Sequence, residues 1–145
     1  MHHTSPSRGR WILAIGAVMV VGACFLQWWE IGGGAGQLDR NSAIGFSSTT
    51  GAVYPMFLAT VATLLLITLP FASERPIAID HPLAYLLLFG IEVVCFAHTV
   101  FVMLQASLIP IPPQHGFGFW LAALGLLVVA RGVFEFYEEY RRRLY

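Results

Sequence analysis

Charged residues are scarce in this 145-residue chain, which has no lysine, eight arginines and eight acidic residues. Together they form 11% of the sequence, whereas a typical soluble domain has about a quarter. This scarcity excludes intrinsic disorder, collagen-like repeats and long coiled coils. Because the formal net charge is zero, the composition predicts no nucleic-acid partner, and no motif indicates a soluble substrate.

Cysteine is also scarce. The two cysteines, Cys24 and Cys95, both lie inside apolar stretches and form no C-x-x-C pair. Their spacing therefore excludes a disulfide framework and a structural zinc site. We expect both to be free thiols that pack as small hydrophobic side chains, and we predict no metal ion.

Apolar residues, in contrast, make up 57% of the chain, and the mean hydropathy is +0.71. They concentrate in four runs, and these are residues 11–29, 54–72, 83–109 and 117–137. The gaps between the runs are rich in Gly, Ser, Thr and Pro, which interrupt helices. We therefore predict an all-α fold, an integral membrane four-helix bundle. It would form a single domain over residues 1–145, with an outer loop at 30–53 and a tail at 138–145.

The arginines predict how the bundle is oriented. If both termini are cytoplasmic, one side of the membrane receives seven arginines, and the other side receives only Arg40. Such a bias is typical of the cytoplasmic side. Aromatic residues that would then mark the two interfaces include Trp11 and Tyr85 on the inside and Trp28 and Trp120 on the outside. We expect a multi-pass protein of a bacterial inner membrane, in contact with lipid.

The third run carries most of the polar residues that fall inside a span. At about 100° per residue, five of them occupy an arc of about 140° on one helix face. They are Glu92, Cys95, His98, Thr99 and Gln105. Because a polar group that faces lipid lacks a partner, we expect this face to point into the bundle.

Glu92 is the one acidic residue well inside a predicted span, because Glu135 lies beyond the uncharged part of the fourth run, which ends at Ala130. An ionised carboxylate at that depth costs about 3 kcal/mol on insertion scales. One interpretation is a group that handles protons, binds a ligand or contacts a basic residue of another subunit. The other is a neutral carboxyl that is hydrogen-bonded to a neighbouring helix, through Thr60, Thr63 or Thr68.

His98 lies on the same arc and could ligate a haem or a chlorophyll. No second histidine of this chain is expected at the same depth, because His81 and His115 fall at opposite interfaces. We therefore predict no cofactor within this chain. A haem or chlorophyll held jointly with another chain is one alternative, and a hydrogen-bonded packing histidine is the other.

The fourth run carries small residues in one stripe, formed by Gly118, Ala122, Gly125 and Gly132. Such stripes let helices approach closely in membranes. We expect it to pack against the third helix, with a subunit contact as the alternative. Three arginines then end the tail, Arg141, Arg142 and Arg143. They would anchor the helix to anionic lipid headgroups or dock a partner.

Two segments resemble a widespread type of protein. The aromatic end of the first run, 25–30, precedes a Gly-rich loop, and residues 116–125 read GFGFWLAALG. Both features are similar to small, largely uncharacterised bacterial proteins with four transmembrane helices. The layout is also distantly similar to claudins, although the outer loop lacks their cysteine pair and their Gly-Leu-Trp motif. The resemblance implies a topology and no activity.

No convincing catalytic set is present. We therefore expect a non-catalytic structural or accessory subunit of a larger membrane protein complex, with other integral membrane subunits as partners. A bioenergetic complex, respiratory or photosynthetic, is the first host we would consider. The alternative is a small oligomeric membrane protein that handles protons or a ligand through the polar face of the third helix.

Overall fold

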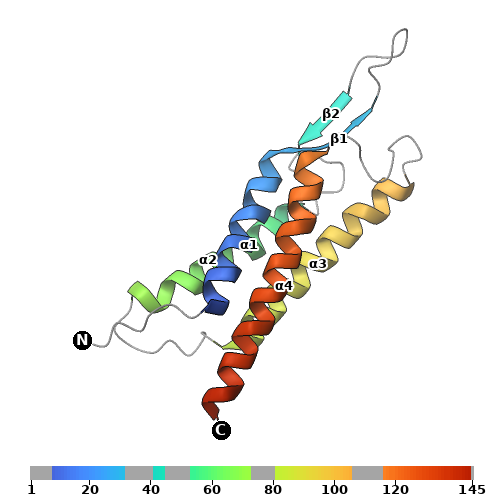
Figure 1. Cartoon of the computed structure of the whole chain (residues 1–145). Coiled ribbons are helices and arrows are strands. Elements are labelled where there is room, and N and C mark those ends of the chain that lie inside the picture. The colour runs from blue at the N-terminus through green and yellow to red at the C-terminus, as the bar shows by residue number, and fades with distance from the viewer. Residues whose placement is uncertain (1–7, 32–40, 45–52, 73–80, 106–115, 145) are drawn as a thin grey trace.

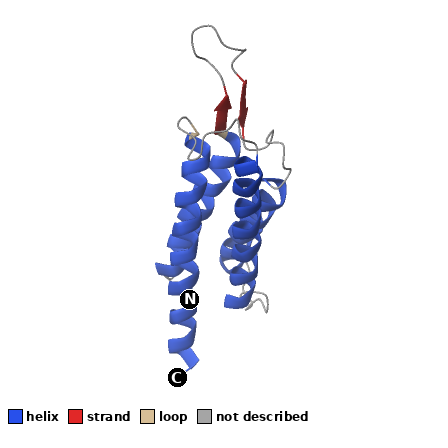
Figure 2. Ribbon diagram, turned by 90° about the vertical axis from the view of Figure 1, so that its right-hand side faces the viewer, coloured by secondary structure: helices blue, strands red, loops and turns tan. Residues whose placement is uncertain are grey.

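A computed structural model describes residues 8–31, 41–44, 53–72, 81–105 and 116–144 of the chain. Within them lie four helices and one hairpin (Figure 1). The helices are α1 (Arg8–Phe25), α2 (Val53–Ala72), α3 (Pro82–Gln105) and α4 (Phe117–Leu144), and the strands are β1 (Gln27–Ile31) and β2 (Asn41–Ile44). The helices pack alongside one another, and the hairpin projects from the end opposite the chain termini (Figures 1 and 2).

Three of the helices, α1, α3 and α4, are long and apolar enough to cross a membrane. This confirms the prediction of a helical membrane protein. The fourth, α2, is equally apolar, but its described apolar part is the shorter segment Val53–Leu69. A fourth crossing by α2 and the direction of the chain across the membrane stay predictions.

The closest helix pair is α1 with α4, which run antiparallel. Glycines of both helices stand where the backbones touch, because a Cβ at these positions would lie 2.7 to 3.0 Å from a backbone nitrogen of the other helix. The closest pairs are Gly9 with Phe136, Leu13 with Gly132, Gly16 with Val129, and Val20 with Gly125. The two backbones thus stay in contact over about three turns.

Charged side chains join the same two helices at the end where the chain termini lie. Glu139 of α4 accepts a hydrogen bond at 3.2 Å from the backbone N–H of Gly9, in the first turn of α1. A carboxylate there satisfies a free donor and complements the helix dipole. Nearby, Glu135 lies 2.8 Å from Arg131 and 3.6 Å from Arg8. These contacts hold the beginning of α1 against the end of α4.

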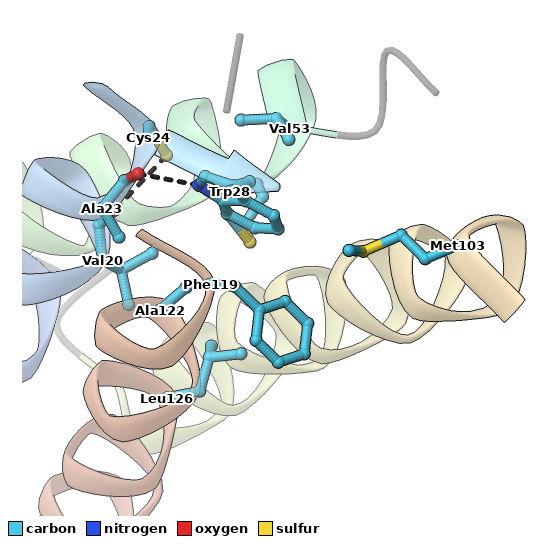
Figure 3. Close-up of a cluster of buried hydrophobic side chains, with 10 residues drawn as sticks. Val20, Ala23, Cys24, Trp28, Val53, Met103, Phe119, Ala122 and Leu126 are labelled. Carbon is cyan, nitrogen blue, oxygen red and sulfur yellow. Dashed lines mark hydrogen bonds between the residues drawn. The ribbon is translucent and has the colours of Figure 1, made fainter. Parts of the chain in front are cut away.

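At the other end, α1 stops earlier than the sequence predicts. We expected a helix to residue 29 and a loop from residue 30, but the helix ends at Phe25 and the strand β1 begins at Gln27. The reason is Trp28, which folds back so that its indole N–H donates to the carbonyl of Ala23 at 2.7 Å (Figure 3). The same carbonyl also accepts from the backbone N–H of Leu26 at 3.1 Å, so two donors meet it at the end of the helix.

Trp28 is also fully buried, so it does not mark a lipid interface as we expected. Its ring lies 6.0 Å from that of Phe96 on α3 and 6.2 Å from that of Phe119 on α4, measured between centroids. Tyr85 likewise is buried, 5.0 Å from the ring of Phe136. Trp28 therefore joins three helices at one end of the apolar core, and Tyr85 joins two of them towards the other.

Helix α3 is packed more loosely than α1 and α4. It leans away from α4 towards its C-terminal end (Figure 1), and most of its side chains are partly or fully exposed. Its buried residues are Pro82, Tyr85, Glu92, Thr99 and Met103. They fall on one narrow face, so the rest of the helix surface is left for lipid or for another protein.

Candidate functional site

The interior of the helix packing contains one buried carboxyl, that of Glu92. Its side chain has no exposed surface, and neither carboxylate oxygen has a hydrogen-bond partner among the described residues. Such an oxygen normally finds a donor, because leaving it unpaired costs about 1–3 kcal/mol. An unpaired buried polar group is therefore a candidate functional feature.

The threonine hydroxyls on α2 donate to carbonyls of their own helix rather than to Glu92. Thr60 lies beside the Glu92 carboxyl, but its hydroxyl donates to its own helix, to the carbonyl of Met56 at 2.8 Å. Thr63 and Thr68 also donate to carbonyls of α2. The hydrogen bond predicted between Glu92 and one of these threonines stays a prediction for Thr60, whose hydroxyl oxygen can still accept from a protonated Glu92 carboxyl. Each hydroxyl satisfies a carbonyl one turn earlier, as is common for threonine in helices.

Two thiols lie within electrostatic range of Glu92, those of Cys24 and Cys95. Cys24 is buried and its thiol is 3.3 Å from the carbonyl of Val20, while Cys95 is half-buried. Thr99 completes this surrounding, with its hydroxyl bonded to the carbonyl of Cys95 at 3.0 Å. Among the described residues, no three His, Cys, Asp or Glu side chains converge closely enough to hold a metal ion.

The predicted polar arc of α3 is divided by the structure. Glu92 and Thr99 are buried and Cys95 is half-buried, whereas His98 and Gln105 are exposed. The expectation that all five point into the bundle is therefore wrong for these last two. On the helical wheel they lie about 60° to 80° beyond Cys95, outside the narrow strip that α2 and α4 cover. Neither His98 nor Gln105 forms a hydrogen bond, ion pair or ring contact with another described residue. A haem or chlorophyll at His98 stays a prediction that needs another chain.

The glycine stripe of α4 packs within the chain, but against a different helix from the one expected. Gly118, Gly125 and Gly132 all face α1, where an added Cβ would meet backbone or side-chain atoms within 3.0 Å. Ala122 on the same stripe is fully buried. We expected the third helix as the partner. The stripe instead matches two glycines of α1, Gly9 and Gly16, which share its seven-residue spacing.

The arginines predicted for docking lie at the end of α4. Arg141 and Arg142 are exposed, and Arg142 lies 3.6 Å from Glu138, one helical turn earlier. The side chain of Arg143 lies outside the described part of the chain. Because α4 continues to Leu144 as a charged helix, these side chains extend beyond the apolar part of the packing. They remain accessible to headgroups or to a partner.

An open apolar groove lies between α2 and α3. It is lined by alanine and leucine alone, namely Ala62, Leu65, Leu66, Ala84, Leu87 and Leu88. The groove offers no hydrogen-bonding or charged group, so it suits an acyl chain or an apolar side chain rather than a polar ligand.

Trp28 and Cys24 are the two site residues that the sequence did not indicate. For Cys24 the signal is weak, because its distance from Glu92 depends on how α1 packs against α3. For Trp28 a signal existed: the pair Trp28–Trp29 favours a strand over the end of a helix, because aromatic residues are enriched in strands.

No family model, curated protein or solved structure matches this chain.

Proposed function

We propose that this protein is a non-catalytic structural subunit of a larger membrane assembly, and that α3 is the helix through which it docks. The carrying observation is that His98, inside a helix apolar and long enough to span a membrane, is exposed and has no partner among the described residues. In a bilayer such a side chain is costly unless another protein group accepts its hydrogen bonds.

The packing of the other helices supports a docking role for α3. Contacts between α1 and α4 bury their glycines, and the charged residues at their ends form ion pairs with each other. Helix α3, like α1 and α4, presents large apolar side chains outward, with Leu87, Val94 and Phe101 between 56% and 70% exposed, but few of its residues are buried. The contact between α1 and α4 thus stabilises the single chain, whereas the outward face of α3 is available to a neighbouring protein.

Photo-crosslinking in intact membranes tests the proposal. A benzophenone amino acid placed at Val94 of α3 should form adducts with another membrane protein chain. The same probe at Leu127 of α4 is a matched control, because the two side chains are 67% and 68% exposed. Mass spectrometry of the adducts would identify the partner. If position 94 gives no more protein adducts than position 127, α3 faces lipid and the proposal fails.

A second candidate function is favoured by the unpaired carboxyl of Glu92. It is a small membrane protein that handles protons or a ligand, with Glu92 as the binding group. A carboxyl can release and take back a proton when water or another acceptor reaches it, and no hydrogen bond between Glu92 and a described residue has to break first. Thr60, Thr99 and the two thiols would line the site, and the protein would act as an oligomer, since four helices are few for a transporter.

The variants Glu92→Gln and Thr99→Val separate this candidate from a structural role. In vesicles with reconstituted protein, a pH-sensitive dye inside should report a proton flux that Glu92→Gln abolishes. Thr99→Val keeps the carboxyl and should retain flux. Equal flux in the parent protein, in Glu92→Gln and in empty vesicles would exclude proton handling.

A further inference from the structure

We propose that the neighbour of α3 is the α3 helix of a second copy of this chain, packed in parallel around a two-fold axis normal to the membrane. The inference rests on the proposed docking role of α3 and names the partner. It concerns one line of side chains on the outward face, formed by Leu87, Ile91, Val94, His98, Phe101 and Gln105, here called the α3 seam.

The α3 seam has the spacing of a helix–helix contact. Its members follow one another at alternating intervals of four and three residues, which keeps them on one line when two helices cross at a shallow angle. All six are exposed in the single chain. The half-buried Leu88, Cys95 and Val102 lie along one side of the seam, where the helix turns towards its own bundle.

Small residues border the other side of the seam. Gly90 and Ala97 are exposed, one seam repeat apart, and an added Cβ at Gly90 would meet nothing within 4 Å. Between α1 and α4 of this chain, the same seven-residue spacing of small residues lets two backbones touch. Gly90 and Ala97 likewise leave the surface low, but none of the described helices covers it.

Spacing alone does not select α3, because the outward faces of α1 and α4 show it too. What distinguishes the α3 seam is its polar content. The exposed threonine of α2, Thr68, is bonded to its own backbone at 2.9 Å, and the exposed arginine of α4, Arg131, is paired with Glu135. Away from the ends of the candidate spans, His98 is the exposed polar side chain of the described helices that lacks such a partner, and Gln105 follows it at the end of α3.

The chemistry of these two residues points to a second copy. A neutral imidazole and a carboxamide each carry both a donor and an acceptor, so each can pair with its own kind. Two copies in one membrane share their orientation, and a two-fold axis normal to the membrane places identical residues at the same height. His98 would then meet its counterpart, and Gln105 would meet its own two turns further on. A polar residue at such a position also fixes the register of the two helices.

Disulfide formation in membranes tests the inference. In a background with Cys24→Ala and Cys95→Ala, a single cysteine at Val94 or Phe101 should give covalent dimers under mild oxidation. Leu127→Cys on α4, of equal exposure, should not. Adding His98→Leu and Gln105→Leu should lower the dimer yield by about threefold to tenfold, because interhelical hydrogen bonds in membranes are individually weak. Gly90→Leu should lower it further, since it blocks close approach without touching the fold of the single chain.

The outcomes distinguish this inference from the proposed function. Dimers at positions 94 and 101 that weaken with Gly90→Leu support self-association through the α3 seam. If single-cysteine chains do not cross-link while the benzophenone at Val94 captures a different protein, the second copy is excluded and the docking role stands. If neither probe yields a protein adduct, both proposals are overturned. Equal dimer yields at positions 94 and 127 would indicate random collision and also overturn the inference.

Discussion

Where α1 meets α4, glycines spaced by seven residues bring two backbones into contact, whereas the buried face of α3 carries a carboxyl and a threonine. The first interface is almost free of polar side chains inside the core, and its charges pair at one end of the helices. The second leaves both oxygens of Glu92 without a hydrogen bond.

The contrast indicates which part of the molecule is built for stability. Close backbone contact increases van der Waals packing, which is the main source of helix association in a bilayer. An unpaired buried carboxyl does the opposite and lowers stability. A protein that keeps such a group is expected to use it, because stability and activity often conflict at functional sites.

The largest effect is expected at Trp28, which joins α1, α3 and α4. Trp28→Ala removes the bond to Ala23 and leaves a cavity between Phe96 and Phe119, so it should lower the free energy of unfolding by about 3–5 kcal/mol. Unfolding in mixed micelles with rising SDS, followed by circular dichroism, measures this. Trp11→Ala is the control, since Trp11 is 60% exposed, and its effect should be small. Equal losses in both variants would show that Trp28 does not hold the helices together.

A smaller loss of stability is expected at Gly125, within the α1–α4 contact. Its Cβ in Gly125→Ala would lie 2.8 Å from a methyl of Val20 and 3.0 Å from the Val20 nitrogen, which forces the helices apart. Overpacking of this kind costs about 1–3 kcal/mol.

The matched control for this prediction is Gly22→Ala on α1, where an added Cβ meets nothing within 4 Å. Alanine is a better helix former than glycine by up to about 1 kcal/mol, so this variant should be neutral or more stable. The two substitutions should therefore shift the same SDS unfolding midpoint in opposite directions. A loss of stability in Gly22→Ala as large as in Gly125→Ala would contradict the interface.

On the interior face of α3 we expect a substitution that raises the free energy of unfolding rather than lowering it. Glu92→Met replaces a buried group without hydrogen bonds by an apolar side chain of similar size, and should raise the free energy of unfolding by about 1–2 kcal/mol. Glu92→Gln keeps an unpaired polar group and should gain less. A Met variant less stable than the parent would mean that the carboxyl has a stabilising partner, and the contrast between the two interfaces would disappear.

The helices could be predicted from the sequence because long apolar runs have few other ways to bury their backbone polar groups in a membrane. The end of α1 could not. It depends on a bond between the Trp28 indole and the Ala23 carbonyl, and on ring contacts with residues about 70 and 90 positions away. Such long-range contacts leave no periodic signal in the sequence. The strand pairing of β1 and β2 was also missed, although the aromatic pair Trp28–Trp29 favours a strand.

The sequence could predict which polar residues α3 carries, but not which of them face the neighbouring helices. Helical periodicity places Glu92, His98 and Thr99 at known angles around α3, but it does not say where the neighbouring helices lie. Packing against α2 and α4 covers the side with Glu92 and Thr99 and leaves His98 outside. The partner of the α4 glycines could have been inferred, because Gly9 and Gly16 repeat their spacing within α1.

The smallest loss of stability is expected at the charged end of the α1–α4 contact, where two glutamates of α4 differ in exposure and in their ion-pair partners. The carboxylate of Glu135 is 14% exposed and lies 2.8 Å from Arg131 and 3.6 Å from Arg8 of α1, whereas that of Glu138 is 47% exposed and has Arg142 at 3.6 Å. Exposed pairs contribute about 0.2–1 kcal/mol, so Glu135→Gln should cost up to about 1 kcal/mol and Glu138→Gln should cost less than half of that. Added salt should reduce both losses, because it screens exposed charges. Of these two glutamates, Glu135 is the one that contacts α1, through Arg8. A larger loss of stability in Glu138→Gln than in Glu135→Gln would therefore show that contacts along α4, and not the contact with α1, determine the stability of this end.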